Sequence, residues 1–285
     1  MSRAPKILVF DSGLGGLTVY AEIARLRPDA HLIYAADDAA FPYGDLSADV
    51  LIARVMSVLE RLIDRCGPDA VVIACNTAST LALPHLRARF SHMPFIGTVP
   101  AIKPAAGLSR SGLISVLATP GTVARDYTHD LVRTYAAHCV VNLVGSSVLA
   151  SLAEAFMQGS HIADAAIAEE ILPAFVSDEH RRTDCIVLAC THYPLLLEHF
   201  ERLAPWKVEW IDPASAIARR TDHVLREVGF SLAPYPSSVP NYAIFTGEAG
   251  PGAQLLAALR LRGIANAVIA KMPHHKEHIL GPQAL

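Results

Sequence analysis

The stretch VVIACNTAST (71–80) and the stretch IVLACTHYPLL (186–196) decide which fold the sequence predicts. Each is a β-branched apolar run that ends in Ala-Cys and is followed by a small polar cluster. An apolar run without alternation is typical of a strand that is buried on both faces of a parallel sheet. Because the two cysteines, Cys75 and Cys190, stand 115 positions apart in similar surroundings, the pattern indicates two related units.

Short apolar runs alternate with longer helical patterns along the whole chain. In the first part, strands are predicted over 6–10, 31–36 and 70–75, with helices over 17–26 and 48–65. In the second part, strands are predicted over 112–119, 139–145 and 185–190, with helices over 123–137 and 162–176. The tail is predicted to form a helix near 213–228, a Pro/Ser-rich loop over 231–241, a strand over 242–247 and a helix near 251–262, and it has a last apolar run at 267–270.

This alternation predicts an α/β fold with two pseudo-symmetric domains, each a parallel-type sheet flanked by helices, and an active site between them. The first domain is expected to comprise 1–99 together with 210–285, because the tail can return and pack on it. The second domain is expected to comprise 100–209. Gly97 and two prolines within 97–104 predict a hinge at the boundary.

Composition narrows the class of protein. The 285 residues are 52% hydrophobic and 18% charged, which argues against a disordered chain. A net charge of −3 without basic runs argues against nucleic acid or anionic membrane as a partner. The first apolar run, ILVF (7–10), is too short for a signal peptide, and no run is long enough to span a bilayer. Five cysteines without a CxxC pair predict reduced thiols in the cytoplasm and no metal site, with a monomer and a homodimer both left open.

Ligands of open parallel sheets bind beyond the carboxyl ends of the strands. The candidate residues at those ends are Asp11, Ser12, Gly13, Pro42, Tyr43, Gly44, Cys75, Asn76, Thr77, Thr119, Gly121, Thr122, Cys190, Thr191 and His192, with Glu154 downstream. The polar clusters can also be plain helix caps, through Asn76 and Thr191. The GLGG stretch (13–16) favours a tight turn over a nucleotide loop, because it lacks the GxGxxG spacing and the P-loop lysine.

Two thiols on opposite sides of a bound carbon form a two-base device. A lone cysteine is usually a small buried hydrophobe, but two in equivalent places favour a function. One thiolate removes a proton and the other thiol delivers one to the opposite face, so the carbon is inverted. A free thiol has a pKa of about 8.5, so Asp11, Glu154 and His192 are candidates for tuning its protonation. No cofactor is visible in the sequence, so hydrogen bonds and charges must stabilise the planar intermediate.

At these residues the chain resembles a known family. FDSGLGGLTV (10–19), FPYG (41–44), ACNTAST (74–80), LATPGTV (117–123) and ACTHYPLL (189–196), in this order, resemble the glutamate racemases of the aspartate/glutamate racemase superfamily. The resemblance runs from about residue 6 to 220. It implies two pseudo-symmetric α/β domains and a cofactor-independent interconversion of L- and D-glutamate. The product, D-glutamate, would then supply peptidoglycan synthesis.

The resemblance also implies residue roles. Cys75 would handle the proton of the D-enantiomer and Cys190 that of the L-enantiomer, with Asp11, Glu154 and His192 assisting. The implied substrate contacts are Asp11, Ser12, Pro42, Tyr43, Gly44, Asn76, Thr77, Thr119, Thr191 and His192. The VPAIKPA segment (99–105) is similar to a proteobacterial type of the enzyme. Some members of that type are monomers activated by a UDP-linked peptidoglycan precursor, which makes such an activator a hypothesis here.

Three other interpretations stay open from the residues alone. The same pair of thiols would serve a racemase of another acid, such as aspartate. A Cys–His pair can also act as the nucleophile of a hydrolase or transferase. A two-lobed protein that binds a small anion, with incidental cysteines, is the interpretation outside the enzymes.

Overall fold

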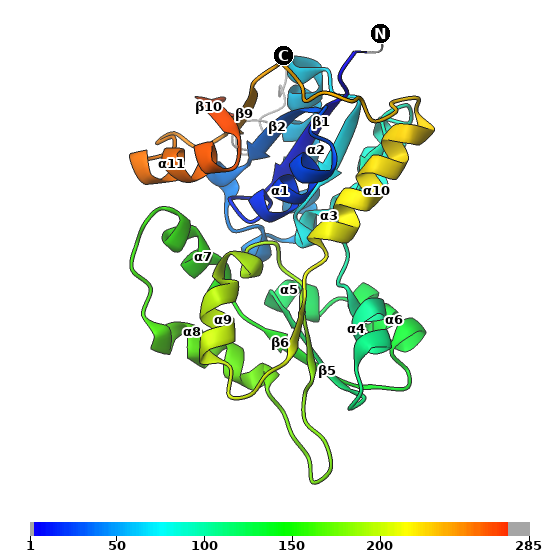
Figure 1. Cartoon of the computed structure of the whole chain (residues 1–285), viewed down its shortest axis with the longest axis vertical. Helices are drawn as coiled ribbons and strands as arrows, with labels where there is room; N and C mark the ends of the chain where they lie inside the picture. Colours follow the sequence, from blue (N-terminus) through cyan, green and yellow to red (C-terminus); the bar gives the residue numbers. More distant parts are fainter. Residues whose placement is uncertain (1–2, 273–285) are drawn as a thin grey trace, which may run out of the picture.

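Two parallel sheets organise the computed structural model, which describes residues 3–272. They form two lobes stacked along the long axis of the molecule (Figure 1). The upper sheet has six strands in the order β10-β9-β2-β1-β3-β4, and the lower has four in the order β6-β5-β7-β8. Every pairing between these strands is parallel. The predicted α/β fold with parallel sheets is therefore confirmed.

The upper lobe combines the first part of the chain with its tail. Its strands are β1 (Lys6–Asp11), β2 (His31–Ala36), β3 (Ala70–Ile73), β4 (Phe95–Ile96), β9 (Asn241–Phe245) and β10 (Ile264–Ile269). Its helices are α1 (Leu17–Leu26), α2 (Ala48–Cys66), α3 (Asn76–Arg89), α10 (Ala214–Glu227) and α11 (Ala253–Leu261), with the short 3₁₀ turns η1 (Asp38–Ala40) and η2 (Tyr43–Asp45). α2 ends at Gly67, whose φ of 53° lies in the left-handed region that glycine adopts readily.

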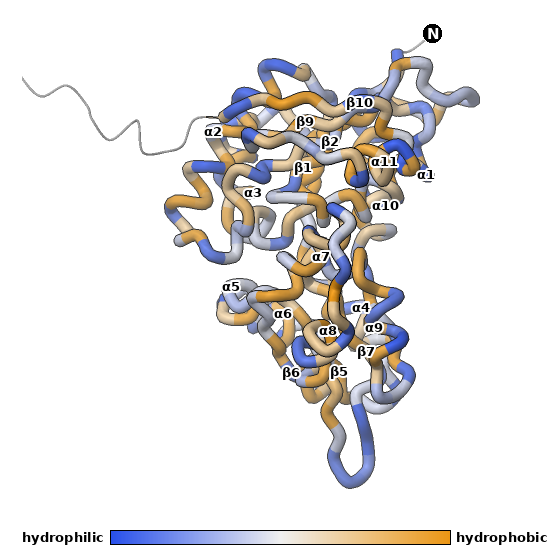
Figure 2. Tube along the Cα trace, turned by 90° about the vertical axis from the view of Figure 1, so that its left-hand side faces the viewer, coloured by the Kyte–Doolittle hydropathy of each residue, from blue (hydrophilic) through white to orange (hydrophobic). Residues whose placement is uncertain are grey.

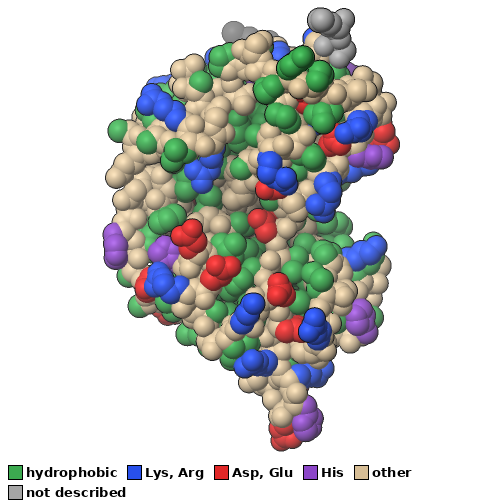
Figure 3. All heavy atoms as spheres, in the orientation of Figure 1, with side chains coloured by type: hydrophobic (Ala, Val, Ile, Leu, Met, Phe, Trp, Pro, Cys, Tyr) green, Lys and Arg blue, Asp and Glu red, His purple; other side chains and the backbone are tan. Residues whose placement is uncertain are grey.

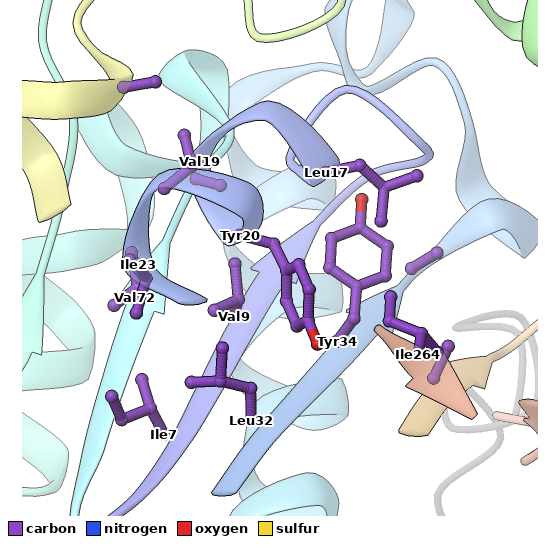
Figure 4. Packing of buried hydrophobic residues seen from close by; sticks show 14 of the residues in the cluster. Ile7, Val9, Leu17, Val19, Tyr20, Ile23, Leu32, Tyr34, Val72 and Ile264 are labelled. Atoms are coloured by element: carbon purple, nitrogen blue, oxygen red, sulfur yellow. The ribbon is translucent and has the colours of Figure 1, made fainter. Parts of the chain in front are cut away.

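Helices cover both faces of the upper sheet. Val9 faces α1 and packs in one cluster with Tyr20 and Ile23, as Figure 4 shows. Leu8 and Phe10 point to the other face and pack in the cluster that contains the buried side of α2. Because both faces are covered, β1 is apolar at successive positions, which is what made it recognisable as a buried strand.

The lower lobe repeats this arrangement with a smaller sheet. Its strands are β5 (Leu113–Ala118), β6 (Val140–Gly145), β7 (Cys185–Leu188) and β8 (Glu209–Ile211). Its helices are α4 (Ile102–Leu108), α5 (Pro120–Val123), α6 (Asp126–Tyr135), α7 (Leu149–Met157), α8 (Asp164–Ile171) and α9 (Leu197–Leu203), with the 3₁₀ turns η3 (Leu172–Ala174) and η4 (Tyr193–Leu196). Apolar segments run through the middle of both lobes, whereas the loop 177–182 at the lower tip is hydrophilic (Figure 2).

Two predicted helices are wrong in extent. The helix expected over 123–137 is two helices, α5 and α6, separated by Arg125 in an extended conformation. The hydroxyl of Thr128 donates to the carbonyl of Thr122 across this break, at 2.6 Å. The helix expected over 162–176 ends at Ile171 and continues as η3, which contains Pro173. The strands β4 and β8 were not predicted, because two and three residues are too short to show a pattern.

The tail contributes two strands rather than the one expected. β9 pairs with β2, and β10 pairs with β9, so residues 241–269 extend the upper sheet. The buried guanidinium of Arg27 donates to Asp29 at 2.8 Å and to Asp222 of α10 at 3.3 Å, which ties α10 to the same lobe. β8 lies in the lower sheet and reaches Ile211, past the expected boundary at 209/210. The domain boundaries stay a prediction, and 273–285 lie outside the described residues.

Among residues 3–272, no helix combines the length and the hydropathy that a bilayer crossing requires.

Candidate active site

A small cavity lies between the two lobes, where the carboxyl ends of their strands meet. The upper lobe lines it with Ser12, Phe41, Pro42, Tyr43, Gly44, Cys75, Asn76 and Thr77, and the lower lobe with Thr119, Ala150, Ala189, Cys190, Thr191 and His192. The candidate site residues from the sequence are all in this set except Asp11, Gly13, Gly121, Thr122 and Glu154. Its volume of about 20 Å³ is room for about one water molecule. A larger ligand therefore requires the lobes to part.

Cys75 forms the wall of the upper lobe. It follows β3 and caps α3, because its Sγ accepts a hydrogen bond from the N–H of Ala78 at 3.5 Å. The hydroxyl of Ser12 lies 3.9 Å from the same sulfur. Burial, and then the negative charge of Asp11, raise the pKa of Cys75 to about 12, against the effect of the Ala78 N–H. Cys75 is therefore a protonated thiol at neutral pH, placed to donate a proton.

Asn76 is the first residue of α3, and the alternative that it is a plain helix cap does not apply, because Cys75 caps the helix. Both polar atoms of the Asn76 amide are buried without a hydrogen-bond partner among the described residues. Unsatisfied buried polar groups are rare in folded proteins. Since Asn76 lines the cavity, its amide is placed to bind a polar ligand.

Cys190 forms the wall of the lower lobe and leads into a chain of polar groups. Its Sγ lies 3.9 Å from Nδ1 of His192, and Nε2 of His192 lies 2.8 Å from Oε1 of Glu154. The N–H of Leu14, from the upper lobe, donates to the same Glu154 oxygen. The structure therefore brings together the predicted residues Cys190, His192 and Glu154. Glu154 contacts His192 and does not itself line the cavity.

The environment of His192 favours the protonated form of its imidazole. Burial alone would lower the pKa of His192, but hydrogen bonds to Cys190 and Glu154, and the charges of Cys190 and Asp11, raise it well above its usual value. An imidazolium beside a sulfur stabilises the thiolate. The two thiols are thus held differently, because Cys75 has no such partner among the described residues.

Asp11 lies behind the cavity and is fully buried. Its carboxylate accepts hydrogen bonds from the N–H of Gly16 at 3.0 Å and from the hydroxyl of Thr191 at 3.3 Å. Burial raises the pKa of Asp11, and the charge of His192 opposes this rise. The sequence left open that Thr191 is a plain helix cap. Its hydroxyl instead donates to Asp11, and this hydrogen bond connects the lower lobe to the upper one.

The turn that carries Tyr43 is held by a buried ion pair that the sequence analysis missed. The hydroxyl of Tyr43 donates to Asp37 at 2.6 Å, and the guanidinium of Arg54 donates to both oxygens of Asp37, with Nε–Oδ2 at 2.8 Å. Thr246, at the end of β9, donates to Asp37 at 2.6 Å. The available signal was an arginine on the apolar face of the helix 48–65 and an aspartate directly after a strand.

Arg125 joins the lobes on another side of the cavity. It lies between α5 and α6, and its Nη1 donates to the carbonyl of Thr77 at 3.3 Å and to the hydroxyl of Thr80. Thr77 and Thr80 belong to α3 of the upper lobe. This contact was not predicted, because the break between α5 and α6 that aims Arg125 at α3 has no sequence signal.

Within residues 3–272, no group of three His, Cys, Asp or Glu side chains has the arrangement of metal ligands.

Residues 8–221 match the family described as Asp/Glu/Hydantoin racemase. The chain belongs to this racemase family. Its curated relatives include the glutamate racemase of Agrobacterium fabrum, 52% identical over 83% of this chain and 89% of that protein. The glutamate racemase of Rhizobium meliloti is 51% identical over 93% of this chain and 95% of that protein. The resemblance noted in the sequence is therefore confirmed.

A solved structure supports the same assignment. The Escherichia coli glutamate racemase, in complex with L-glutamate and the activator UDP-MurNAc-ala, is similar with a TM-score of 0.85 and 39% identity. The match covers 94% of this chain and 98% of that one. The racemase described here thus shares its whole fold, with both lobes, with a protein of known chemistry.

Proposed function

We propose that this protein interconverts L-glutamate and D-glutamate without a cofactor, with Cys190 and Cys75 as the two bases. The observation that carries the proposal is that two thiols from opposite lobes line one closed cavity, with the imidazole of His192 beside the sulfur of Cys190 only. The relatives named glutamate racemase support glutamate as the substrate.

The different surroundings of the two sulfurs assign a direction to each thiol. Cys190, beside the His192 imidazolium, takes the α-proton of L-glutamate as a thiolate. Cys75, a thiol with a pKa near 12 before substrate binds, delivers a proton to the opposite face and gives D-glutamate. The enzyme is left with a Cys190 thiol and a Cys75 thiolate, which is the form that accepts D-glutamate in the reverse reaction.

Substrate contacts follow from the polar groups around the cavity. The unpaired amide of Asn76 and the N-terminal N–H groups of α3 suit a carboxylate. The hydroxyls of Ser12, Thr119 and Thr191, and the Pro42-Tyr43-Gly44 turn, would surround the rest of the substrate. Asp11 would act on the substrate amino group and on Cys75 through its charge.

Single substitutions of the two cysteines test the mechanism. Cys75→Ser and Cys190→Ser should each lower the racemisation rate by roughly 10²- to 10⁴-fold, because proton transfer by a positioned group contributes that much. Cys139→Ser, at a half-buried cysteine that does not line the cavity, is the matched control and should keep the parent rate. A parent rate in either catalytic variant would contradict the two-base mechanism.

Washout of the α-proton in deuterated water identifies the substrate and the class of reaction. L-glutamate should lose its α-proton with the parent enzyme, whereas L-aspartate should not. A hydrolase or transferase would instead accumulate a covalent adduct on one cysteine and exchange no α-proton.

We further propose that the protein acts in the cytoplasm, where D-glutamate supplies peptidoglycan synthesis, and that a UDP-linked precursor of that polymer activates it. The supporting feature is a cavity of about 560 Å³ where α10 faces α4 and α6, on the hollowed side of the molecule in Figure 3. Lys103, Arg219 and Arg220 line it together with the ring of Tyr127. Cations and an aromatic ring suit a diphosphate and a base.

Rates with and without UDP-N-acetylmuramoyl-L-alanine test the activator. We expect a higher rate with the parent enzyme and a weaker response in an Arg219→Ala/Arg220→Ala variant. An unchanged parent rate would remove the proposal and leave the racemase mechanism untouched.

A further inference from the structure

A second cavity lies on the far side of Glu154 from the catalytic thiols. Its volume is about 280 Å³, and it opens between α7 of the lower lobe and the segment that leads into α11 of the upper lobe, which face each other in Figure 1. Its lining consists of Leu14, Asp38, Glu154, Gln158, Phe245, Ala249, Gly250, Pro251, Gly252 and Leu255. None of these residues lines the catalytic cavity.

Glu154 is the group that connects the two cavities. Its Oε1 accepts the hydrogen bond from His192 Nε2, and the Glu154 side chain is 13% exposed, against 3% for His192. Among the described residues, both hydrogen bonds of the carboxylate go to Oε1, one from His192 and one from Leu14. Glu154 therefore has one oxygen in the chain that leads to Cys190 and an accessible side that borders the second cavity.

The proposed reaction creates a need for such a connection. After one conversion of L- to D-glutamate, Cys190 has gained a proton and Cys75 has lost one. The next conversion in the same direction requires Cys190 to lose its proton again. The catalytic cavity has room for about one water molecule when the lobes are closed, so it offers little solvent to accept that proton.

We propose that the second cavity is a proton port, through which Cys190 exchanges protons with solvent by way of His192 and Glu154. This inference rests on the proposed racemase function and names how that site is reset. The imidazolium of His192 first passes its Nε2 proton to Oε1 of Glu154, and Glu154 releases it to water in the second cavity. A flip of the now neutral ring turns its unprotonated nitrogen towards Cys190, and Sγ passes its proton to that nitrogen, which restores the imidazolium. One proton leaves the protein, and sulfur remains as a thiolate. The reverse sequence protonates Cys190.

The port serves only one of the two thiols. The sulfur of Cys75 contacts the Ser12 hydroxyl and the Ala78 N–H, and neither leads to Glu154. The other ionisable groups that act on this region are Asp11, which is fully buried, and Asp38, which lines the second cavity. The carboxylate of Asp38 accepts hydrogen bonds from the N–H groups of Thr246 and Gly247, which hold it at the wall of the second cavity.

Chemical rescue tests the port. Glu154→Ala removes the relay, and the turnover rate at saturating glutamate should fall by roughly 10²-fold, the lower end of what proton transfer contributes. Formate is small enough to enter from the second cavity and take the proton from His192. It should restore the rate by about tenfold or more, in proportion to its concentration. The KM for glutamate should not respond to formate, which separates proton transfer from a structural effect.

Blocking the cavity tests the route. A Cβ at Gly252 meets no atom within 4 Å, so Gly252→Phe adds a ring to the cavity wall without a collision at its base. In the Glu154→Ala background, Gly252→Phe should reduce the rescue by formate about fivefold, because formate loses access to His192 through the second cavity. Ala249→Phe, on the same wall, provides a second block if the first variant does not fold. Gly107→Phe, at a glycine of α4 that also has open space, is the matched control.

The inference is overturned if formate fails to rescue Glu154→Ala, or if rescue is undiminished by both Gly252→Phe and Ala249→Phe. Rescue that survives Gly107→Phe and is lost in the two blocked variants supports it. A failure of the proposed function looks different, because the parent enzyme would then not racemise glutamate at all.

Discussion

Replacing Gly15 by alanine tests whether the two lobes must close on each other for catalysis. Gly15 lies in the upper lobe, and a Cβ at this position would lie 2.5 Å from Nδ1 of His192 and 2.6 Å from its backbone nitrogen, in the lower lobe. Ordinary contacts of a Cβ begin at about 3.4 Å. Because a backbone atom cannot swing away like a side-chain end, the two walls must separate by roughly 1 Å.

The expected loss follows from that displacement. A misplacement of about 1 Å costs roughly 10²-fold in rate, which corresponds to about 2.7 kcal/mol of transition-state stabilisation. Folding should change little, because Gly15 has no positive φ and the collision lies between the lobes rather than within one. Initial rates of racemisation by circular dichroism measure the first effect, and thermal unfolding measures the second.

Gly121→Ala is the matched control for this change. Gly121 belongs to the LATPGTV motif, in the lower lobe, but a Cβ there would meet its nearest atom at 3.7 Å, which is an ordinary contact. The control should keep the parent rate within a factor of about two, because nothing has to move. If Gly15→Ala turned over as fast as Gly121→Ala, the requirement for closure would be refuted.

Three further changes probe the surroundings of the site. Asp37→Asn removes the carboxylate charge that pairs with the buried Arg54 guanidinium and should lower the free energy of unfolding, measured in urea, by about 3 kcal/mol. An unchanged midpoint would argue against the importance of this pair. Arg125→Ala removes a contact between the lobes. The factor by which it raises the KM for glutamate should be about tenfold larger than the factor by which it lowers the turnover rate. A KM equal to that of the parent enzyme would show that the contact is incidental. The pKa of His192 is raised in the folded protein, so its contribution to stability is complete below its unfolded pKa of about 6.5 and is lost as the pH rises through the folded value. His192→Asn should therefore abolish that part of the stability lost on going from about pH 6 to pH 9, measured by urea unfolding, and an unaltered pH dependence would contradict the assignment.

The sequence predicted the elements whose pattern is local and missed those that depend on distant partners. The strands at 31–36 and 185–190 were recognisable because buried parallel strands are apolar at successive positions. The ion pair of Asp37 and Arg54 was not, because it is completed by Thr246 from the tail. No local pattern reports such a contact.

The GLGG stretch illustrates the same limit. A tight turn was expected there, and the chain does turn between β1 and α1. Gly13 and Gly15 are required for another reason, since a Cβ at Gly13 would collide with Glu154 and one at Gly15 with His192, both from the other lobe. The need for glycine arises from the approach of two lobes, which the sequence alone does not reveal.

The position of β9 and β10 in the upper sheet has a consequence for biosynthesis. The edge of β2 stays uncovered until residues 241–269 have left the ribosome, although β2 itself is made well before them. A nascent chain with both lobes otherwise formed would present an unpaired parallel strand, a known site for mispairing and aggregation. It would also lack the Thr246 hydroxyl that supports Asp37 and, through it, Tyr43. The enzyme therefore becomes competent only after residues 241–269 have been made, and nonsense truncations before residue 269 in the tail should yield insoluble protein rather than a weakened racemase.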